Sequence, residues 1–62
     1  MDIEHLPPEE REQFWLGRID YRLALLARLI DAEAPATMIA KQRDLIDAAE
    51  QGLADAQREI SR

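Results

Sequence analysis

Three carboxylates in the C-terminal half, Asp44, Asp47 and Glu50, are the residues of this sequence best placed for chemistry. At steps of three residues they would share one side of a helix, where carboxylates can bind a divalent cation or transfer protons. No histidine or cysteine lies near them, and the same spacing is typical of the solvated side of an amphipathic helix. We therefore interpret them as surface acids and expect no metal and no cofactor.

A nucleophilic site is equally hard to assemble from this chain. The single histidine, His5, lies in the N-terminal segment, far in sequence from the hydroxyls of Thr37 and Ser61. Nucleophilic catalysis needs a base beside the attacking group, and the chain contains no cysteine. The sequence therefore predicts a protein that is not an enzyme.

The charge of the chain restricts its partners. A formal net charge of −5 disfavours direct binding to nucleic acid and to anionic membranes, because both require clustered lysine and arginine. The N-terminus "MDIEHLPPEE" carries acids where a signal peptide would carry positive charge, and no apolar run approaches transmembrane length. We expect a cytoplasmic protein, and the preference for arginine over lysine favours a bacterial or phage gene.

Prolines divide the chain into two predicted helices within a single domain, residues 1–62. Residues 1–6 are expected to form a flexible tail, and the Pro7-Pro8 pair marks the start of a helix over residues 7–33. Pro35 disfavours helical geometry at Ala34, which predicts a turn over residues 34–37. The second helix is expected over residues 38–60, with Pro35 or Thr37 at its start.

Apolar residues recur at heptad spacing in both predicted helices and favour an antiparallel two-helix hairpin. The expected seams pair Ile30 with Ile39, Leu23 with Ile46 and Leu16 with Leu53 across the hairpin. One long helix kinked at Pro35 and paired with another chain is the alternative that the same heptads allow. The complete expected seams comprise Leu16, Ile19, Leu23, Leu26 and Ile30 in the first helix and Ile39, Gln42, Ile46, Ala49, Leu53, Ala56 and Ile60 in the second.

A second set of mostly apolar residues lies beside these seams, on one side of the predicted hairpin. A two-helix hairpin has no third layer to cover such a face, and a cysteine-free chain of 62 residues has little other means of stabilisation. We therefore expect a homodimer in which two hairpins form a four-helix bundle. The predicted dimer interface comprises Phe14, Tyr21, Leu25, Leu29, Met38, Leu45, Ala48 and Gly52.

Trp15, Arg18 and Arg22 lie at the margin of that apolar face and are candidate partner-binding residues, because tryptophan and arginine dominate binding hot spots. The favoured function is a homodimeric helical adaptor or inhibitor that binds a protein partner. One alternative is a nucleic-acid mimic, of the phage anti-host or anti-CRISPR type, whose carboxylates occupy the basic groove of a DNA- or RNA-binding protein. Another alternative is an oligomerisation subunit of a larger assembly.

Overall fold

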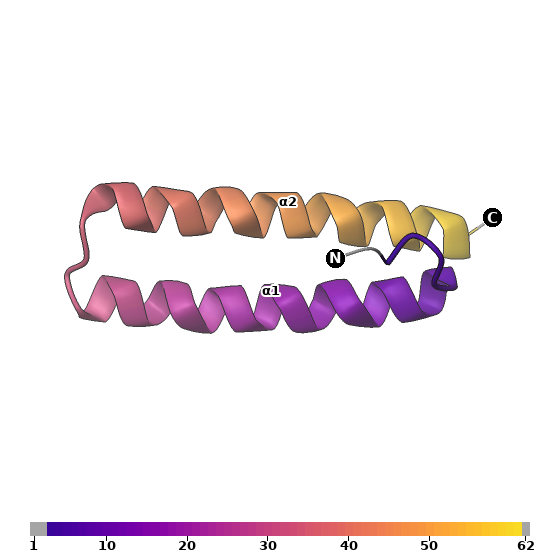
Figure 1. The fold of residues 1–62 in the computed structure, drawn as a ribbon, viewed down its shortest axis with the longest axis horizontal. Coiled ribbons are helices and arrows are strands. Elements are labelled where there is room, and N and C mark those ends of the chain that lie inside the picture. Colours follow the sequence, from indigo (N-terminus) through magenta and orange to yellow (C-terminus); the bar gives the residue numbers. More distant parts are fainter. Residues whose placement is uncertain (1–2, 62) are drawn as a thin grey trace.

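The computed structural model describes residues 3–61, which form two helices, α1 (Pro8–Asp31) and α2 (Ala36–Ile60). The helices run antiparallel, with the connecting turn at one end of the hairpin and the start of α1 and the end of α2 at the other (Figure 1). The hairpin measures 43 × 20 × 14 Å, so it is a single layer of two helices. The predicted all-helical hairpin is confirmed, and the chain does not form one long kinked helix.

The connection between the helices depends on a left-handed residue at the end of α1. Glu33 has a φ of 54°, a conformation that is uncommon for residues other than glycine. The N–H of Ala34 donates to the carbonyl of Leu29 at 2.9 Å, and the N–H of Glu33 donates to Ile30 at 3.0 Å. These two bonds form a Schellman motif, which satisfies carbonyls at the end of α1 and reverses the chain.

Pro35 lies just before α2 as its N-cap residue, and no side chain caps this helix. Its carbonyl accepts the N–H groups of Met38 and Ile39 at 3.0 and 3.2 Å. Thr37 therefore lies inside α2. At the other end of the hairpin Pro8 occupies the first turn of α1, where a missing N–H leaves no intrahelical bond unmade.

The buried side of α2 agrees with the expected seam. Ile46, Ala49 and Ala56 are the buried residues within the described part of the chain. Ile39 and Leu53 are half-buried. Because two of the three buried side chains are alanines, the contact between the helices is close and the core is shallow.

The buried side of α1 differs from the expected seam. Leu16, Leu23 and Ile30 are 42, 48 and 50% exposed, so the expectation that they line the core is wrong. Trp15 instead packs against α2, and Arg22 donates a hydrogen bond to Gln42 of α2. The buried side of α1 is therefore rotated by about one residue from the predicted seam, because the wide apolar arc of this helix allows either orientation.

Residues 3–6, part of the expected tail, turn back between the open ends of the two helices (Figure 1). The N–H of Leu6 donates to the carbonyl of Ile3 at 3.0 Å, and Nε of Arg11 donates to the carbonyl of Leu6 at 3.1 Å. The Arg11 guanidinium also forms an ion pair with Glu59 of α2. Arg11 thus connects the N-terminal turn, α1 and α2; residues 1–2 of the expected tail lie outside the described residues.

Candidate interaction surfaces

The two sides of α1 differ in chemistry. Trp15 faces α2, and its sequence neighbours project about 100° to either side of it, Phe14 to one side and Leu16 to the other. Residues seven apart on a helix point in nearly the same direction, so Arg22 faces α2 as Trp15 does. Tyr21 and Leu23 therefore project to either side of Arg22. We name the first side the aromatic flank, with Phe14, Arg18, Tyr21, Leu25 and Arg28, and the second the aliphatic stripe, with Leu16, Leu23 and Ile30.

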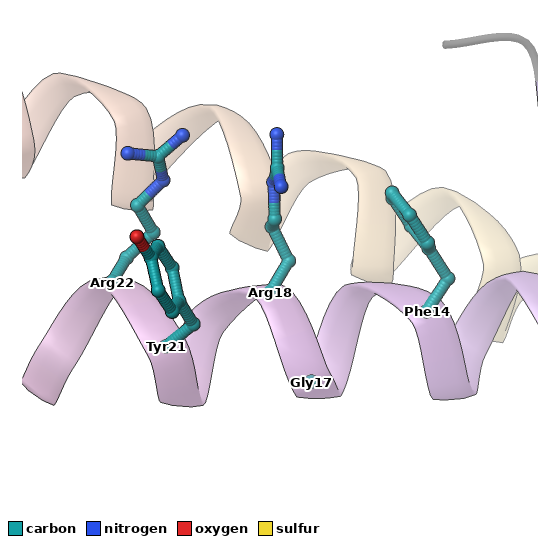
Figure 2. Close-up of a pocket in the computed structure, with 5 residues that line it drawn as sticks. All are labelled: Phe14, Gly17, Arg18, Tyr21 and Arg22. Carbon is teal, nitrogen blue, oxygen red and sulfur yellow. The ribbon is translucent and has the colours of Figure 1, made fainter.

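The aromatic flank contains an open pocket of about 430 Å³. Figure 2 shows the side chains of Phe14, Arg18, Tyr21 and Arg22 rising together from one side of α1. Gly17 contributes no side chain there, and a methyl group added to it would meet nothing within 4 Å. The glycine therefore leaves an open space between the rings of Phe14 and Tyr21.

The two arginines of this pocket are held differently. Nη1 of Arg22 donates to Oε1 of Gln42 at 3.4 Å, and the Arg22 guanidinium lies 5.7 Å from the centroid of the Tyr21 ring. Arg18 is exposed and has no hydrogen bond or ion pair with any residue in the range 3–61. The pocket therefore presents one oriented and one free guanidinium beside aromatic surface, a combination suited to a carboxylate next to an apolar side chain.

A smaller pocket of about 140 Å³ continues along the same flank toward the turn. Tyr21, Ala24, Leu25 and Arg28 line it. Because Tyr21 lines both pockets, the two form neighbouring depressions along α1 rather than separate sites. The flank as a whole is rich in aromatic residues and arginine, the residue types enriched in protein interfaces.

The aliphatic stripe carries no polar group at its three positions. Leu16, Leu23 and Ile30 are separated by seven residues each and all belong to the large apolar side chains that the hairpin leaves exposed. Fourteen residues of helix extend over about 21 Å, so the stripe follows more than half of α1. Its exposure is the main feature that sequence reasoning missed.

Trp15, a predicted anchor for a partner, packs within the hairpin itself. A Cβ atom added to Gly52 would lie 2.6 Å from Cζ2 and 2.8 Å from Cδ2 of the indole, so the ring lies directly over the glycine. The Phe14 ring meets the indole edge-on, with centroids 5.0 Å apart and an interplanar angle of 78°. The small residues on α2, Gly52 and Ala49, were the sequence signal that a bulky side chain of α1 belongs opposite them.

The predicted interface residues lie at different depths in the hairpin. Arg18 of the predicted partner-binding set is exposed, whereas Trp15 and Arg22 are half-buried against α2. Of the predicted dimer interface, Tyr21, Met38 and Ala48 are exposed, and the following residues are half-buried: Phe14, Leu25, Leu29, Leu45 and Gly52.

Other kinds of site find little support in the described part of the chain. Within residues 3–61 no three acidic, histidine or cysteine side chains come close enough together to hold a metal ion. Asp44, Asp47 and Glu50 are all exposed on α2. Neither α1 nor α2 combines the length and the apolarity that crossing a membrane requires.

Comparison of the chain with protein-family models, curated proteins and solved structures gave no match. Functional inference for this chain therefore depends on the surfaces of its own hairpin.

Proposed function

We propose that this protein is a non-enzymatic interaction module, a homodimeric helical adaptor or inhibitor that binds a protein partner. One observation carries the proposal. Six large apolar side chains are exposed, while the buried residues of the described chain are one isoleucine and two alanines. Monomeric proteins rarely leave so much large apolar surface uncovered, and a core of this size is marginal for a chain of 62 residues.

A second copy of the chain is the proposed cover for part of this surface. Two hairpins can stack into a four-helix bundle, in which each helix has apolar neighbours on two sides. The face with Tyr21 and Leu25, predicted from the sequence, is one candidate interface, and the aliphatic stripe is the other. Sedimentation velocity across a concentration series tests this part of the proposal; a folded monomer at every concentration would reject it.

The aromatic flank is the proposed site for the protein partner. Phe14 and Tyr21 offer rigid apolar contact area, and the guanidinium of Arg18 is free to pair with a carboxylate. A partner with an acidic residue beside an apolar one fits this surface. The local positive charge also distinguishes the flank from the rest of an acidic chain and disfavours a role as a nucleic-acid mimic.

Capture of partners from the native host, followed by binding measurements with the captured protein, tests the partner site. Tyr21→Ala and Arg18→Ala should each weaken binding at least tenfold, because both remove a central contact of the pocket. Arg43→Ala is the matched control, since Arg43 is exposed on α2 outside the pocket. Binding that falls steeply with salt but ignores Tyr21→Ala would instead favour the mimic.

A further inference from the structure

We propose that the second copy docks on the aliphatic stripe, with a two-fold axis beside Leu23, rather than on the aromatic flank. This inference rests on the proposed homodimer and specifies its contact surface. The two candidate surfaces lie on opposite sides of the line from α1 to α2, because Phe14 and Leu16 project to either side of Trp15. A single two-fold contact can therefore cover one of them and leaves the other outside.

The surface area of the hairpin favours a second copy as the occupant. The accessible surface is 4734 Å², whereas a compact protein of 7.1 kDa exposes about 4,100 Å². The excess of about 600 Å² is close to the roughly 800 Å² that each partner buries in a stable interface of ordinary size. A contact along one whole face of the hairpin supplies an area of this order.

The spacing of the stripe makes it self-complementary. Leu23 lies seven residues from Leu16 and seven from Ile30. If α1 meets α1 of the second copy antiparallel about Leu23, Leu16 lies opposite Ile30 of that copy, and the two Leu23 side chains meet. In a two-fold dimer the same surface of both copies forms the contact, so that surface must fit itself. A different protein bound to the stripe would not require this symmetry.

The neighbours of the stripe allow this contact. Ile19 and Leu26 border it on the side toward α2, and Ala27 borders it on the outer side, where its small side chain permits close approach. Asp20 is the nearest acid on the outer side. About the proposed axis the two Asp20 residues are six residues apart along the helices, which separates them by about 9 Å and makes their repulsion weak.

The aromatic flank is the poorer surface for a dry contact. Arg18 and Arg22 line its pocket together with the rings of Phe14 and Tyr21 (Figure 2). Two copies joined through this pocket would bring four guanidinium groups together, and no carboxylate lines the pocket. Burying charge without a partner is far less favourable than burying leucine and isoleucine, so the stripe is the favoured surface.

Cysteine cross-linking tests whether the aliphatic stripe is the dimer interface. The natural chain has no cysteine, so any disulfide must come from the introduced residue. The axes of packed helices lie about 8–10 Å apart, and Cα atoms lie about 2.3 Å from the axis of their own helix. Two residues that face each other at the two-fold axis are therefore close enough to form a disulfide. Leu23→Cys should therefore form a disulfide-linked dimer under mild oxidation. Tyr21→Cys is the matched control, since Tyr21 is 59% exposed on the other flank of the same helix.

The pairing direction has its own test. A mixture of Leu16→Cys and Ile30→Cys chains should form the mixed disulfide in preference to either symmetric one, as antiparallel packing about Leu23 requires. Preferential symmetric disulfides would overturn the proposed axis. Circular dichroism of each reduced variant verifies that it is folded before oxidation.

Sedimentation provides a measurement that needs no cross-link. Leu23→Glu should raise the dimer dissociation constant about 100-fold or more, because it places a charge in the apolar contact, whereas Tyr21→Glu should change it little. If Tyr21→Cys cross-links as well as or better than Leu23→Cys, the stripe is not the interface, although the homodimer stands. If the natural chain sediments as a monomer throughout, the homodimer itself is refuted.

Discussion

The contact between Trp15 and Gly52 yields opposite expectations for the same substitution at the two glycines of the chain. Both Gly17 and Gly52 lie within helices, where replacing glycine by alanine usually gains about 1 kcal/mol. At Gly17 the added methyl group meets nothing within 4 Å, so this gain should appear in full. Gly17→Ala is therefore expected to stabilise the hairpin by about 1 kcal/mol.

At Gly52 the added carbon would lie 2.6 Å from Cζ2 of Trp15, whereas carbon atoms in contact prefer about 3.5–4.0 Å. The rigid indole must move by about 1 Å, and overpacking of this kind typically destabilises by about 1–3 kcal/mol. Phe14 packs against the same ring and restricts its movement, which favours the upper part of that range. After the gain in helix propensity, Gly52→Ala should destabilise by about 1–2 kcal/mol.

Urea unfolding followed by circular dichroism measures both variants at one fixed protein concentration, because self-association would contribute to the apparent stability. With an m-value of about 1 kcal/mol per M, the two midpoints should differ by about 2 M or more. In a Trp15→Leu background the smaller side chain removes the clash, so Gly52→Ala should become stabilising. If Gly52→Ala stabilises the natural chain as much as Gly17→Ala does, Trp15 does not pack over Gly52.

Three further changes test other contacts of the hairpin. Glu33→Gly should stabilise it by about 1 kcal/mol in thermal unfolding, since a φ of 54° disfavours residues with a side chain; a loss of stability would refute the left-handed turn. Arg11→Gln should lower stability by about 0.5–1 kcal/mol through the ion pair with Glu59, and a loss that persists unchanged in 1 M salt would contradict this cause. Leu25→Glu and Leu45→Glu should each destabilise by about 2 kcal/mol or more in urea titrations, because both half-buried leucines would be replaced by a charge; unchanged midpoints would show that neither is packed.

The difference between the two helices shows how far the sequence could predict this fold. In α2 the large residues of the predicted seam lie on one side of the helix, and this side was expected to face α1. Ile46 is buried there as expected. In α1 large apolar residues cover more than half of the circumference, and the heptads through Leu16 and through Trp15 are both plausible. The choice depends on the facing helix, where Gly52 leaves space for an indole.

Arg22 is one reason why the sequence pattern predicted the wrong side of α1 to face α2. A pattern of apolar and polar residues assigns an arginine to the surface, yet Arg22 is half-buried and reaches Gln42 across the contact. Arginine can occupy such a position because its long apolar stem packs while its guanidinium finds a polar partner. Its hydrogen bond joins Arg22 to Gln42, which is distant in sequence, and the spacing of residues within one helix cannot predict such a contact.

The turn lies at residues 32–35, two residues before the predicted turn over residues 34–37, and its conformation was not predicted. Pro35 fixes where α1 can no longer continue, and α1 ends at Asp31, shortly before it. Nothing in the sequence marks Glu33 as left-handed, because glycine or asparagine is the usual residue there. The hydrogen bonds that close the Schellman motif maintain this conformation in spite of the residue type.

The two proposals constrain each other through the geometry of α1. Phe14 and Leu16 project to opposite sides of the hairpin, so a dimer formed on the aliphatic stripe leaves both aromatic flanks outside, related by the two-fold axis. Such a dimer would bind two partner molecules, and self-association and partner binding would not compete. A dimer formed through the aromatic flank would cover Arg18 and Tyr21, so the partner would have to displace the second copy. Binding stoichiometry therefore separates the two arrangements: two partners per dimer require the stripe as the interface, whereas dissociation of the dimer on binding requires the aromatic flank.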